Sequence, residues 1–433
     1  ERVNYSDDHI FVTASGIPDH SYNFFDTTWP HLGKPDAIPL KITHQNMQWE
    51  IPATVVVPLA ADKEKVPYGP VAILRNGVPL YSSKSRETHK HEGVWIYNTM
   101  YSASDTTEYG FEDWYWFWRY RDEHGAAVNY NGQYHYYANP TAIYNDHPHQ
   151  HSPLLGYAFD GAPIYGPQSY ASTSYIGDGT TTVFVGPTGP EYSITNDAGT
   201  IIRLIDDAHI KIIVDGVSQV PGTHFTYTGA VTPVGNEKNQ ITFAVGKVPA
   251  ADSVVIFTVT SKMQKMRSSY RLKTGTRVAI GTETILVGNY TGEFVEDYEY
   301  VAALGDLDVF NGRTAVTPEY PNGVYAYYVT VDDLDEPVYP YVIGPRYCAR
   351  PEKSNYNATA PTVVESGFVI NDMNQSGIPN ISIDRQGNDS KGFVRPTVEQ
   401  WPDELIPISS KEGLQITVET REPNALYVDA DYV

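Results

Sequence analysis

Residues 70–82 read PVAILRNGVPLYS, two short apolar runs joined at Asn76–Gly77. An Asn-Gly pair between apolar runs is a strong short-range signal for a β-hairpin. A similar arrangement returns at 209–220, HIKIIVDGVSQV, around Asp215–Gly216. Runs of this kind, bounded by Gly, Pro, Asn and Asp, recur along the chain, while the periodicity of a helix is nearly absent. The sequence therefore predicts a mainly β fold with long ordered loops.

The composition argues against several classes of protein. The 433 residues contain 52 Asp and Glu against 30 Lys and Arg, a formal net charge of −22. A field of this sign repels nucleic acid and anionic membranes, so we expect neither as a partner. No run approaches the ~20 apolar residues of a membrane helix. The single cysteine, Cys348, excludes an intramolecular disulfide.

Two pairs of segments within the chain resemble each other. NGVPLY at 76–81 is similar to DGAPIY at 160–165, and GQYHYY at 132–137 is similar to GVYAYY at 323–328. The pairs are either recurrent turn-and-strand patterns or equivalent hairpins in two halves of one domain. The sequence leaves both alternatives open.

The second pair is separated by a segment of different character, whose regularly spaced strand-like runs are typical of a small sandwich. Its GDG–F opening, its VDG-x-x-Q and its late P-A-x-D resemble short β-modules of phage tail proteins. We therefore predict a discontinuous main domain, 1–171 and 263–350, with an inserted β-sandwich at 172–262. The region 351–433 is dense in Asn, Ser, Pro and Gly, which favours an extended C-terminal arm over a small β module.

Five further blocks point to a family. They are GQYHYYANP at 132–140, HSPLLGYAFDGAPIYGP at 151–167, LGDLDVFNGR at 304–313, VTPEYPNGVYAYYVT at 316–330 and YPYVIGP at 339–345. Together with the opening at 7–25, these blocks resemble the YHYH domain, a family of extracellular and phage-encoded proteins. The resemblance covers roughly 260 residues and leaves out the insert and the C-terminal region.

The resemblance carries expectations about residues and source. It implies family-motif positions at Tyr134, His135, Tyr136, Asp160 and Tyr165. The chain departs from the family's name, because Tyr137 stands at the position of the second His of the motif. The segments MRSSYRL at 266–272 and FVEDYEYV at 294–301 look most like marine phage versions, which implies a virion protein of a cyanophage-like virus.

Histidines offer one candidate metal site. In NDHPHQHS, His147, His149 and His151 alternate along the chain, so on a strand their imidazoles would share one face. His135 would approach from a neighbouring strand, and imidazoles suit zinc, copper or nickel. The alternative is that Pro148 breaks the strand and the histidines hydrogen-bond the backbone of a loop.

Oxygen ligands offer another candidate site. Asp306, Asp308 and Asn311 in GDLDVFNG have the short odd spacing of calcium loops. Asx turns and caps explain the same three residues equally well. The cofactor expected for this chain is therefore none, or a divalent metal that is either calcium or a His-bound transition metal.

Catalytic signatures are scarce. There is no G-x-S-x-G, and Cys348 has no local partner signature. Trp114, Trp116 and Trp118 would share one face of a strand, favouring a buried core over a platform for stacking on sugars. We therefore do not expect an enzyme.

The expected function is a structural or adsorption component of a bacteriophage particle, in a tail, fibre or other host-facing appendage. Its partners would be other virion subunits, further copies of itself, and a host surface receptor or glycan. The first residues lack the basic start and apolar run of a secretion signal, and release of particles by lysis would bring the chain outside the cell. The alternatives are a metal-binding or polysaccharide-processing extracellular module and a secreted bacterial YHYH protein.

Overall fold

The computed structural model describes residues 2–6, 8–21, 42–56, 63–88, 94–101, 122, 124–129, 132–187, 193–195, 201–203, 209–228, 231–232, 235–236, 240–280 and 288–356. Across these residues the chain consists of β-strands and three 3-10 turns, η5 (Thr141–Ile143), η7 (Val295–Asp297) and η8 (Lys353–Tyr356). None of these helical turns has the length and apolar character to cross a membrane. The predicted mainly β fold is confirmed.

An eight-stranded sheet forms the centre of the main domain, in the order β25-β26-β11-β10-β4-β5-β9-β8. Its strands are β4 (Pro70–Leu74), β5 (Pro79–Tyr81), β8 (Ala126–Val128), β9 (Tyr134–Tyr136), β10 (Leu154–Ala158), β11 (Pro163–Tyr165), β25 (Gly312–Ala315) and β26 (Val324–Tyr328). The predicted hairpin at 70–82 is β4–β5. Its turn closes with the Gly77 amide donating to the Leu74 carbonyl, and Gly77 takes a φ of 74°, which glycine adopts without strain.

The central sheet consists of two similar halves. β4 and β10 pair antiparallel in the middle, and each half then adds its hairpin partner, β5 or β11. Each partner next pairs in parallel with a tyrosine-rich strand, Leu80 lying opposite Tyr136 in one half and Ile164 opposite Tyr327 in the other. These are the positions that the two sequence echoes make equivalent, so the echoes are equivalent hairpins in two halves of one domain.

A three-stranded sheet covers part of the central sheet. It contains β1 (Arg2–Tyr5), β2 (His9–Ala14) and β3 (Met47–Pro52) in that order. Ile73 and Tyr157, neighbours on β4 and β10, pack against it, and the rings of Trp49 and Phe159 stack at 5.0 Å. The larger core contains most of the other apolar side chains of the central sheet, including Leu74, Leu80, Tyr134, Tyr136, Leu155, Ile164 and Tyr327.

Smaller pairs of strands complete the main domain. They are β6 (Lys84–Thr88) with β7 (Ile96–Asn98), and β23 (Tyr270–Leu272) with β24 (Tyr298–Tyr300). The loop before β24 is held by the buried carboxylate of Asp297, which accepts two hydrogen bonds of 2.8 Å from the Arg277 guanidinium. The predicted aromatic strand at 113–120 lies outside the described residues.

The insert is a sandwich of two sheets. One has the order β12-β22-β16-β17 and the other β13-β21-β18. The strands are β12 (Gln168–Ile176), β13 (Val183–Val185), β16 (Ile210–Val214), β17 (Val217–Ser218), β18 (Phe225–Tyr227), β21 (Gln240–Phe243) and β22 (Val254–Lys265), with the short pairs β14 (Ser193–Thr195)–β15 (Ile201–Arg203) and β19 (Val231–Thr232)–β20 (Gly235–Asn236). Both Asp215 and Gly216 have positive φ, and they join β16 to β17 as the predicted two-residue hairpin.

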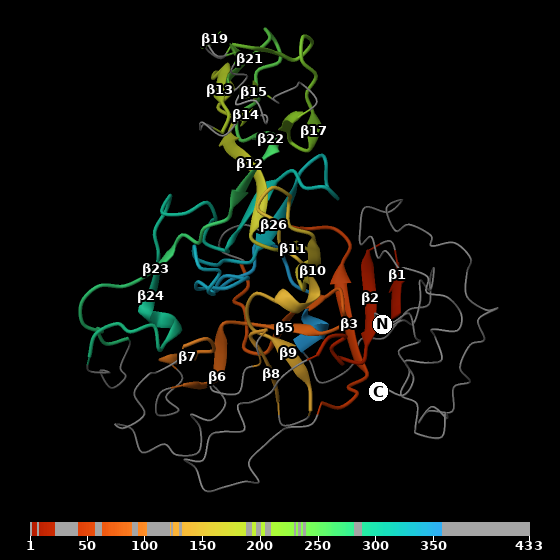
Figure 1. Cartoon of the computed structure of the whole chain (residues 1–433), viewed down its shortest axis with the longest axis vertical. Helices are drawn as coiled ribbons and strands as arrows, with labels where there is room; N and C mark the ends of the chain where they lie inside the picture. Colours follow the sequence, from red (N-terminus) through yellow and green to blue (C-terminus); the bar gives the residue numbers. More distant parts are fainter. Residues whose placement is uncertain are drawn as a thin grey trace, which may run out of the picture.

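The insert has a hydrophobic core of its own. Phe184, Phe225, Phe243 and Phe257 meet there with Ile212, and all five side chains are buried. The predicted inserted sandwich is therefore confirmed. Its limits at 172 and 262 stay a prediction, because residue 172 lies within β12 and residue 262 lies within β22. Figure 1 shows the insert at one end of the long axis of the molecule, carried on these two strands.

The C-terminal region is described only as far as Tyr356. Residues 351–356 lie on the main domain, where the η8 turn contacts β3 and the Tyr356 ring packs edge-on against Phe159 at 5.9 Å. The rest of the predicted arm, from 357 to 433, lies outside the described residues.

Candidate functional site

Strand β9 carries the family motif and sends its side chains to both faces of the sheet. Tyr134 and Tyr136 meet on one face, with ring centres 5.4 Å apart, and His135 meets Tyr137 on the other at 4.8 Å. This is the alternation expected of a strand. Tyr134, His135 and Tyr136 are all buried, so the side chains of the motif contact the interior of the domain and not solvent.

The Tyr136 hydroxyl is the centre of a polar cluster that we call the first half-site. It lies 2.5 Å from His20 Nε2 and accepts a 3.2 Å hydrogen bond from Asn76 Nδ2, which also donates to Asp19 at 3.0 Å. His20 Nδ1 lies 2.9 Å from the Ser21 carbonyl, an acceptor only, so a neutral His20 carries its proton on Nδ1. Nε2 then accepts the Tyr136 proton, and the network is satisfied.

Tyr134 adds a second arm to the first half-site. Its hydroxyl donates to Asp122 Oδ2 at 2.5 Å, while Asp122 Oδ1 accepts from the amides of His124 and Ala126. Burial raises the pKa of Tyr134 and Tyr136 above the ordinary tyrosine value, so both hydroxyls keep their protons. Burial also raises the pKa of the Asp19 carboxyl.

The other half of the sheet repeats this arrangement, and we call the repeat the second half-site. The Tyr327 hydroxyl donates to Asp160 Oδ2 at 2.7 Å, as Tyr136 bonds Asn76. The Tyr325 hydroxyl donates to Asp308 Oδ1 at 2.9 Å, as Tyr134 bonds Asp122. Asp308 Oδ1 also accepts the amides of Phe310 and Gly312, two and four residues on, the same spacing as around Asp122.

The two half-sites differ in what covers them. The first is covered by half-buried Asp19, His20 and His124, and the two imidazole rings meet edge-on at 4.8 Å. The second is covered by buried backbone, because the amide of Cys348 donates to the Tyr327 hydroxyl and the amide of Ala349 donates to Asp160. The cover of the first half-site is therefore half-buried, whereas the Tyr327–Asp160 pair of the second is closed off by buried backbone.

His135 sits on the opposite face from the first half-site. Its ring stacks on Tyr81 with centres 3.8 Å apart, and Nδ1 lies 3.1 Å from the Gln133 carbonyl, so Nδ1 carries the proton. Nε2 is buried and has no hydrogen-bond partner in the described part of the chain. Burial lowers the pKa of His135 to about 4, which keeps the ring neutral at physiological pH.

The histidines at 147, 149 and 151 do not lie on a strand. Residues 144–153 form a loop with a turn at Pro148, which corrects the strand alternative and matches the loop alternative. His147 and His149 are exposed, and His147 Nδ1 accepts the His149 amide at 3.2 Å. His151 turns inward to the Ser152 carbonyl at 2.7 Å, and burial lowers its pKa to about 4.

The predicted oxygen ligands each have a local partner. Asp306 forms an ion pair with Arg267, with Oδ2 3.0 Å from Nε, and Asp308 closes the turn of the second half-site. Asn311 Nδ2 donates to the carbonyls of Tyr328 and Val342 at 3.1 and 2.9 Å. The contacts of Asp308 are those of the Asx-turn alternative, while Asp306 and Asn311 bond residues far away in the sequence.

The remaining family-motif residues lie in the second half of the sheet. Asp160 is fully buried and accepts from the amide of Ala162 as well as from Tyr327 and Ala349. The Tyr165 hydroxyl lies 2.8 Å from Thr317 Oγ1 and donates to Glu319 at 2.8 Å. Four of the five motif residues therefore contribute a hydroxyl or carboxylate to a buried hydrogen bond, and His135 contributes its ring.

The structure brings together a group that the sequence did not indicate. Among the described residues, His9, Glu50 and Glu352 form the one group of three His, Cys, Asp or Glu side chains with ligand atoms all within 4.8 Å of one another. The predicted metal residues His135, His147, His149 and His151 form no such group there. His9, Glu50 and Glu352 come from β2, β3 and the segment before η8, which no local spacing could connect.

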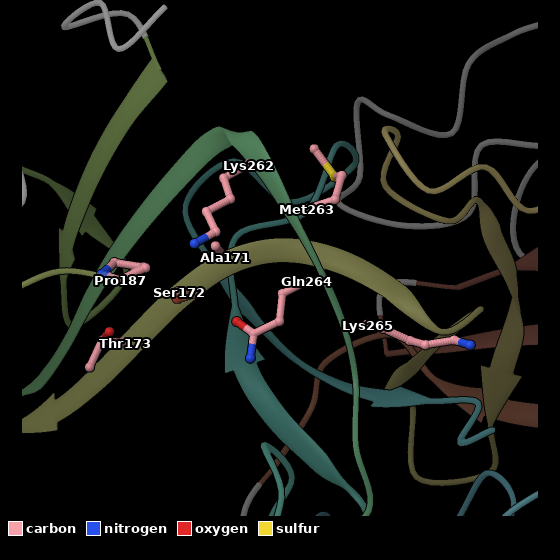
Figure 2. Close-up of a pocket in the computed structure, with 8 residues that line it drawn as sticks. All are labelled: Ala171, Ser172, Thr173, Pro187, Lys262, Met263, Gln264 and Lys265. Carbon is pink, nitrogen blue, oxygen red and sulfur yellow. The ribbon is translucent and has the colours of Figure 1, made fainter. Parts of the chain in front are cut away.

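A groove lies where the insert joins the main domain. Tyr170 pairs with Met263 and Ala171 with Val259, so residues 260–262 of β22 bulge out without a partner on β12. The bulge opens a groove of about 490 Å³ whose lining includes Lys262 and Lys265 (Figure 2). Lys265 Nζ lies 2.6 Å from Asp335 Oδ1, and this ion pair links the insert's long strand β22 to the main domain.

Comparison with known proteins identifies the family. The model of the family described as YHYH protein matches residues 48–199 and 250–340, more than half of the chain. The chain therefore belongs to the YHYH protein family, and the match is interrupted inside the inserted sandwich. No curated protein and no solved structure matches the chain.

Proposed function

We propose that this YHYH-family chain is a structural component of a bacteriophage particle, placed in a tail, fibre or other host-facing appendage. The observation that carries the proposal is the displayed insert. A sandwich with its own core stands at one end of the molecule, on two long strands that continue into the main domain (Figure 1). A module displayed in this way suits contact with a surface better than chemistry in a pocket.

The surface of the insert supports a role in contact. Ile176, Val217, Val220 and Val245 all lie on it, and each exposes more than half of its side chain. Exposed aliphatic side chains mark a contact surface where they form one continuous patch, and we propose that these four belong to such a surface. The partner we propose is a host receptor or glycan, or another subunit of the particle.

The main domain supports a role as a rigid mount. Among the described residues, all of the buried Asp, His, Lys and Arg side chains lie in the main domain, namely Lys63, Asp122, His135, Asp160, Arg277 and Asp297. Buried polar groups with fixed partners restrict a core to one arrangement, which suits a scaffold that must hold its shape. We propose that neighbouring virion subunits, including further copies of this chain, contact this mount.

The location is tested on particles. Antibodies raised against the isolated chain would be applied to purified phage particles from a lysate that contains the coding sequence, with immunogold electron microscopy as the readout. We expect labelling at one defined part of the particle and the chain in the particle's mass spectrum. Finding the chain free in the medium and absent from particles would favour a secreted bacterial YHYH protein instead.

The role of the insert is tested by removing it. Ile176 and Val254 pair directly across β12 and β22, so a two-residue Asn-Gly turn can replace residues 177–253. The full chain should compete with phage for adsorption to host cells, and the shortened chain should not. All seven tryptophans lie outside 172–262, so an unchanged tryptophan unfolding curve would show that the main domain still folds. Equal competition by both chains would contradict a contact role for the insert.

A second candidate function is a binding or polysaccharide-processing module. The observation that favours it is the first half-site, where two half-buried imidazoles cover a chain of hydrogen-bonded tyrosine, amide and carboxylate groups. Host-cell polysaccharide would be incubated with the chain and with a His20→Ala variant. Depolymerisation by the first and not by the second would favour this function over a purely structural one.

A further inference from the structure

We propose that His9, Glu50 and Glu352 bind one divalent cation of the zinc or manganese class. His9 Nε2 lies 3.5 Å from Glu352 Oε2, and His9 Nδ1 lies 3.8 Å from Glu50 Oε1. Two ligands about 2.1 Å from a tetrahedral zinc are about 3.4 Å apart, so the His9–Glu352 spacing already fits a bound ion. All three side chains are half-buried, which leaves the remaining coordination position open to water.

Both glutamates are oriented by the same serine. The Ser354 hydroxyl donates to Glu50 Oε2 at 3.0 Å, and the Ser354 amide donates to Glu352 Oε1 at 3.0 Å. In each carboxylate it is the other oxygen that faces His9. Ligands whose second atom is fixed by a hydrogen bond are typical of metal sites, because the bond presets the ligand's direction.

The backbone around the group is fixed as well. Asn355 accepts the Glu50 amide at 2.8 Å and donates to the Glu50 carbonyl at 2.6 Å, so the η8 turn is clamped to β3 beside the ligands. The three ligands therefore come from segments that are already held together. An ion would add a link between the segment 351–356 and the sheet β2–β3.

Charge and ligand type select the ion. Two carboxylates and a neutral imidazole carry a charge of −2, which one divalent cation balances. The imidazole ligand favours zinc over calcium and magnesium, which take oxygen ligands almost alone, and the two carboxylates also suit manganese. His9 ligates through one nitrogen only, and one ligand atom from each of the three residues already lies within 4.8 Å of the other two.

The experiment measures zinc binding to the full chain. The protein would be stripped with a chelator and titrated with Zn²⁺ by calorimetry, with Mn²⁺ and Ca²⁺ as comparison ions. We expect one site per chain for Zn²⁺ or Mn²⁺ and no response to Ca²⁺. Glu352→Gln and His9→Gln should abolish that site, and Ser354→Ala, which removes only an orienting hydrogen bond, should weaken it about 10–100-fold. Glu336→Gln, an exposed acid elsewhere, is the matched control.

A second readout separates loss of the ion from loss of folding. Trypsin can cleave after Lys353, which is exposed and next to the site, whereas Pro351 protects the bond after Arg350. Zn²⁺ should slow the cleavage after Lys353 in the wild type but not in Glu352→Gln, while the two proteins keep the same thermal midpoint without metal. The proposal is overturned if Zn²⁺ and Mn²⁺ do not bind, if Ca²⁺ binds in their place, or if the site is lost in a His147→Gln/His149→Gln double variant and kept in Glu352→Gln.

Discussion

The turns at Asn76 and Asp160 occupy equivalent positions in the two halves of the central sheet, and each is bonded by a tyrosine hydroxyl from the parallel strand beside it. In the second half the turn residue itself carries the carboxylate. In the first half the turn residue is an amide, and the carboxylate belongs to Asp19 on the covering segment. The carboxylate therefore lies on the sheet in the second half and on the covering segment in the first half.

This difference shows that the same backbone arrangement can hold either a closed, fully buried hydrogen-bond network or a half-buried polar site. A carboxylate on a turn can be satisfied by buried amides, and at Asp160 the amides of Ala162 and Ala349 satisfy it and close the site. An amide on the turn has protons left to donate, so its cover must supply acceptors. The cover of the first half-site supplies Asp19 and His20, whose side chains remain half-buried.

The largest expected loss of stability comes from removing the Asp160 carboxylate. Asp160→Ala would leave two buried amides and the Tyr327 hydroxyl without their acceptor, at about 1–3 kcal/mol each, so the main domain should lose at least about 3 kcal/mol of stability. Tryptophan fluorescence during denaturant unfolding reports on this domain. Asn76→Ala, the matched change in the first half, should lose less. Equal losses would mean that the two half-sites are energetically alike.

A pH titration tests the histidine that only the first half contains. His135 aligns with Ala326, and its folded pKa of about 4 lies below the ordinary value of 6.5. The unfolded chain therefore binds a proton that the folded chain does not, and stability falls as pH drops below 6.5. Between pH 7 and 5 this loss is about 2 kcal/mol. His135→Ala should remove it, so the gap in unfolding free energy between variant and wild type should narrow by that amount.

The control for this titration is His147→Ala, whose ring is exposed. Its unfolding free energy should follow the wild type at every pH. If His135→Ala also followed the wild type in parallel, the ring would not be buried in its neutral form.

The smallest expected effect is the difference in stability between the variants Tyr136→Phe and Tyr327→Phe. Tyr136→Phe should cost about 1 kcal/mol, because water can replace the hydroxyl at half-buried His20. Tyr327→Phe should cost about 2 kcal/mol, because it leaves the buried amide of Cys348 without an acceptor. Thermal unfolding of both variants beside the wild type measures the difference. A larger loss of stability for Tyr136→Phe than for Tyr327→Phe would mean that the first half-site is the more tightly closed of the two.

Part of the half-sites could be predicted from the sequence. The echoes align Tyr136 with Tyr327 and Asn76 with Asp160, and the strand alternation places His135 on the face opposite Tyr134 and Tyr136. The metal interpretation of residues 147–151 rested on strand alternation where Pro148 lies in a loop. The calcium interpretation of Asp306, Asp308 and Asn311 rested on spacing that an Asx turn shares.

The sequence by itself determined the strands, the turns and the inserted sandwich, because alternation of apolar residues and the backbone preferences of Gly, Asn and Asp are local properties. Only the tertiary structure decided which strands pair in parallel, which segment covers each half-site, and that His9, Glu50 and Glu352 meet. Those outcomes depend on contacts between segments far apart in the chain. A carboxylate's partners follow from the segment that packs over it, and local sequence does not record that segment.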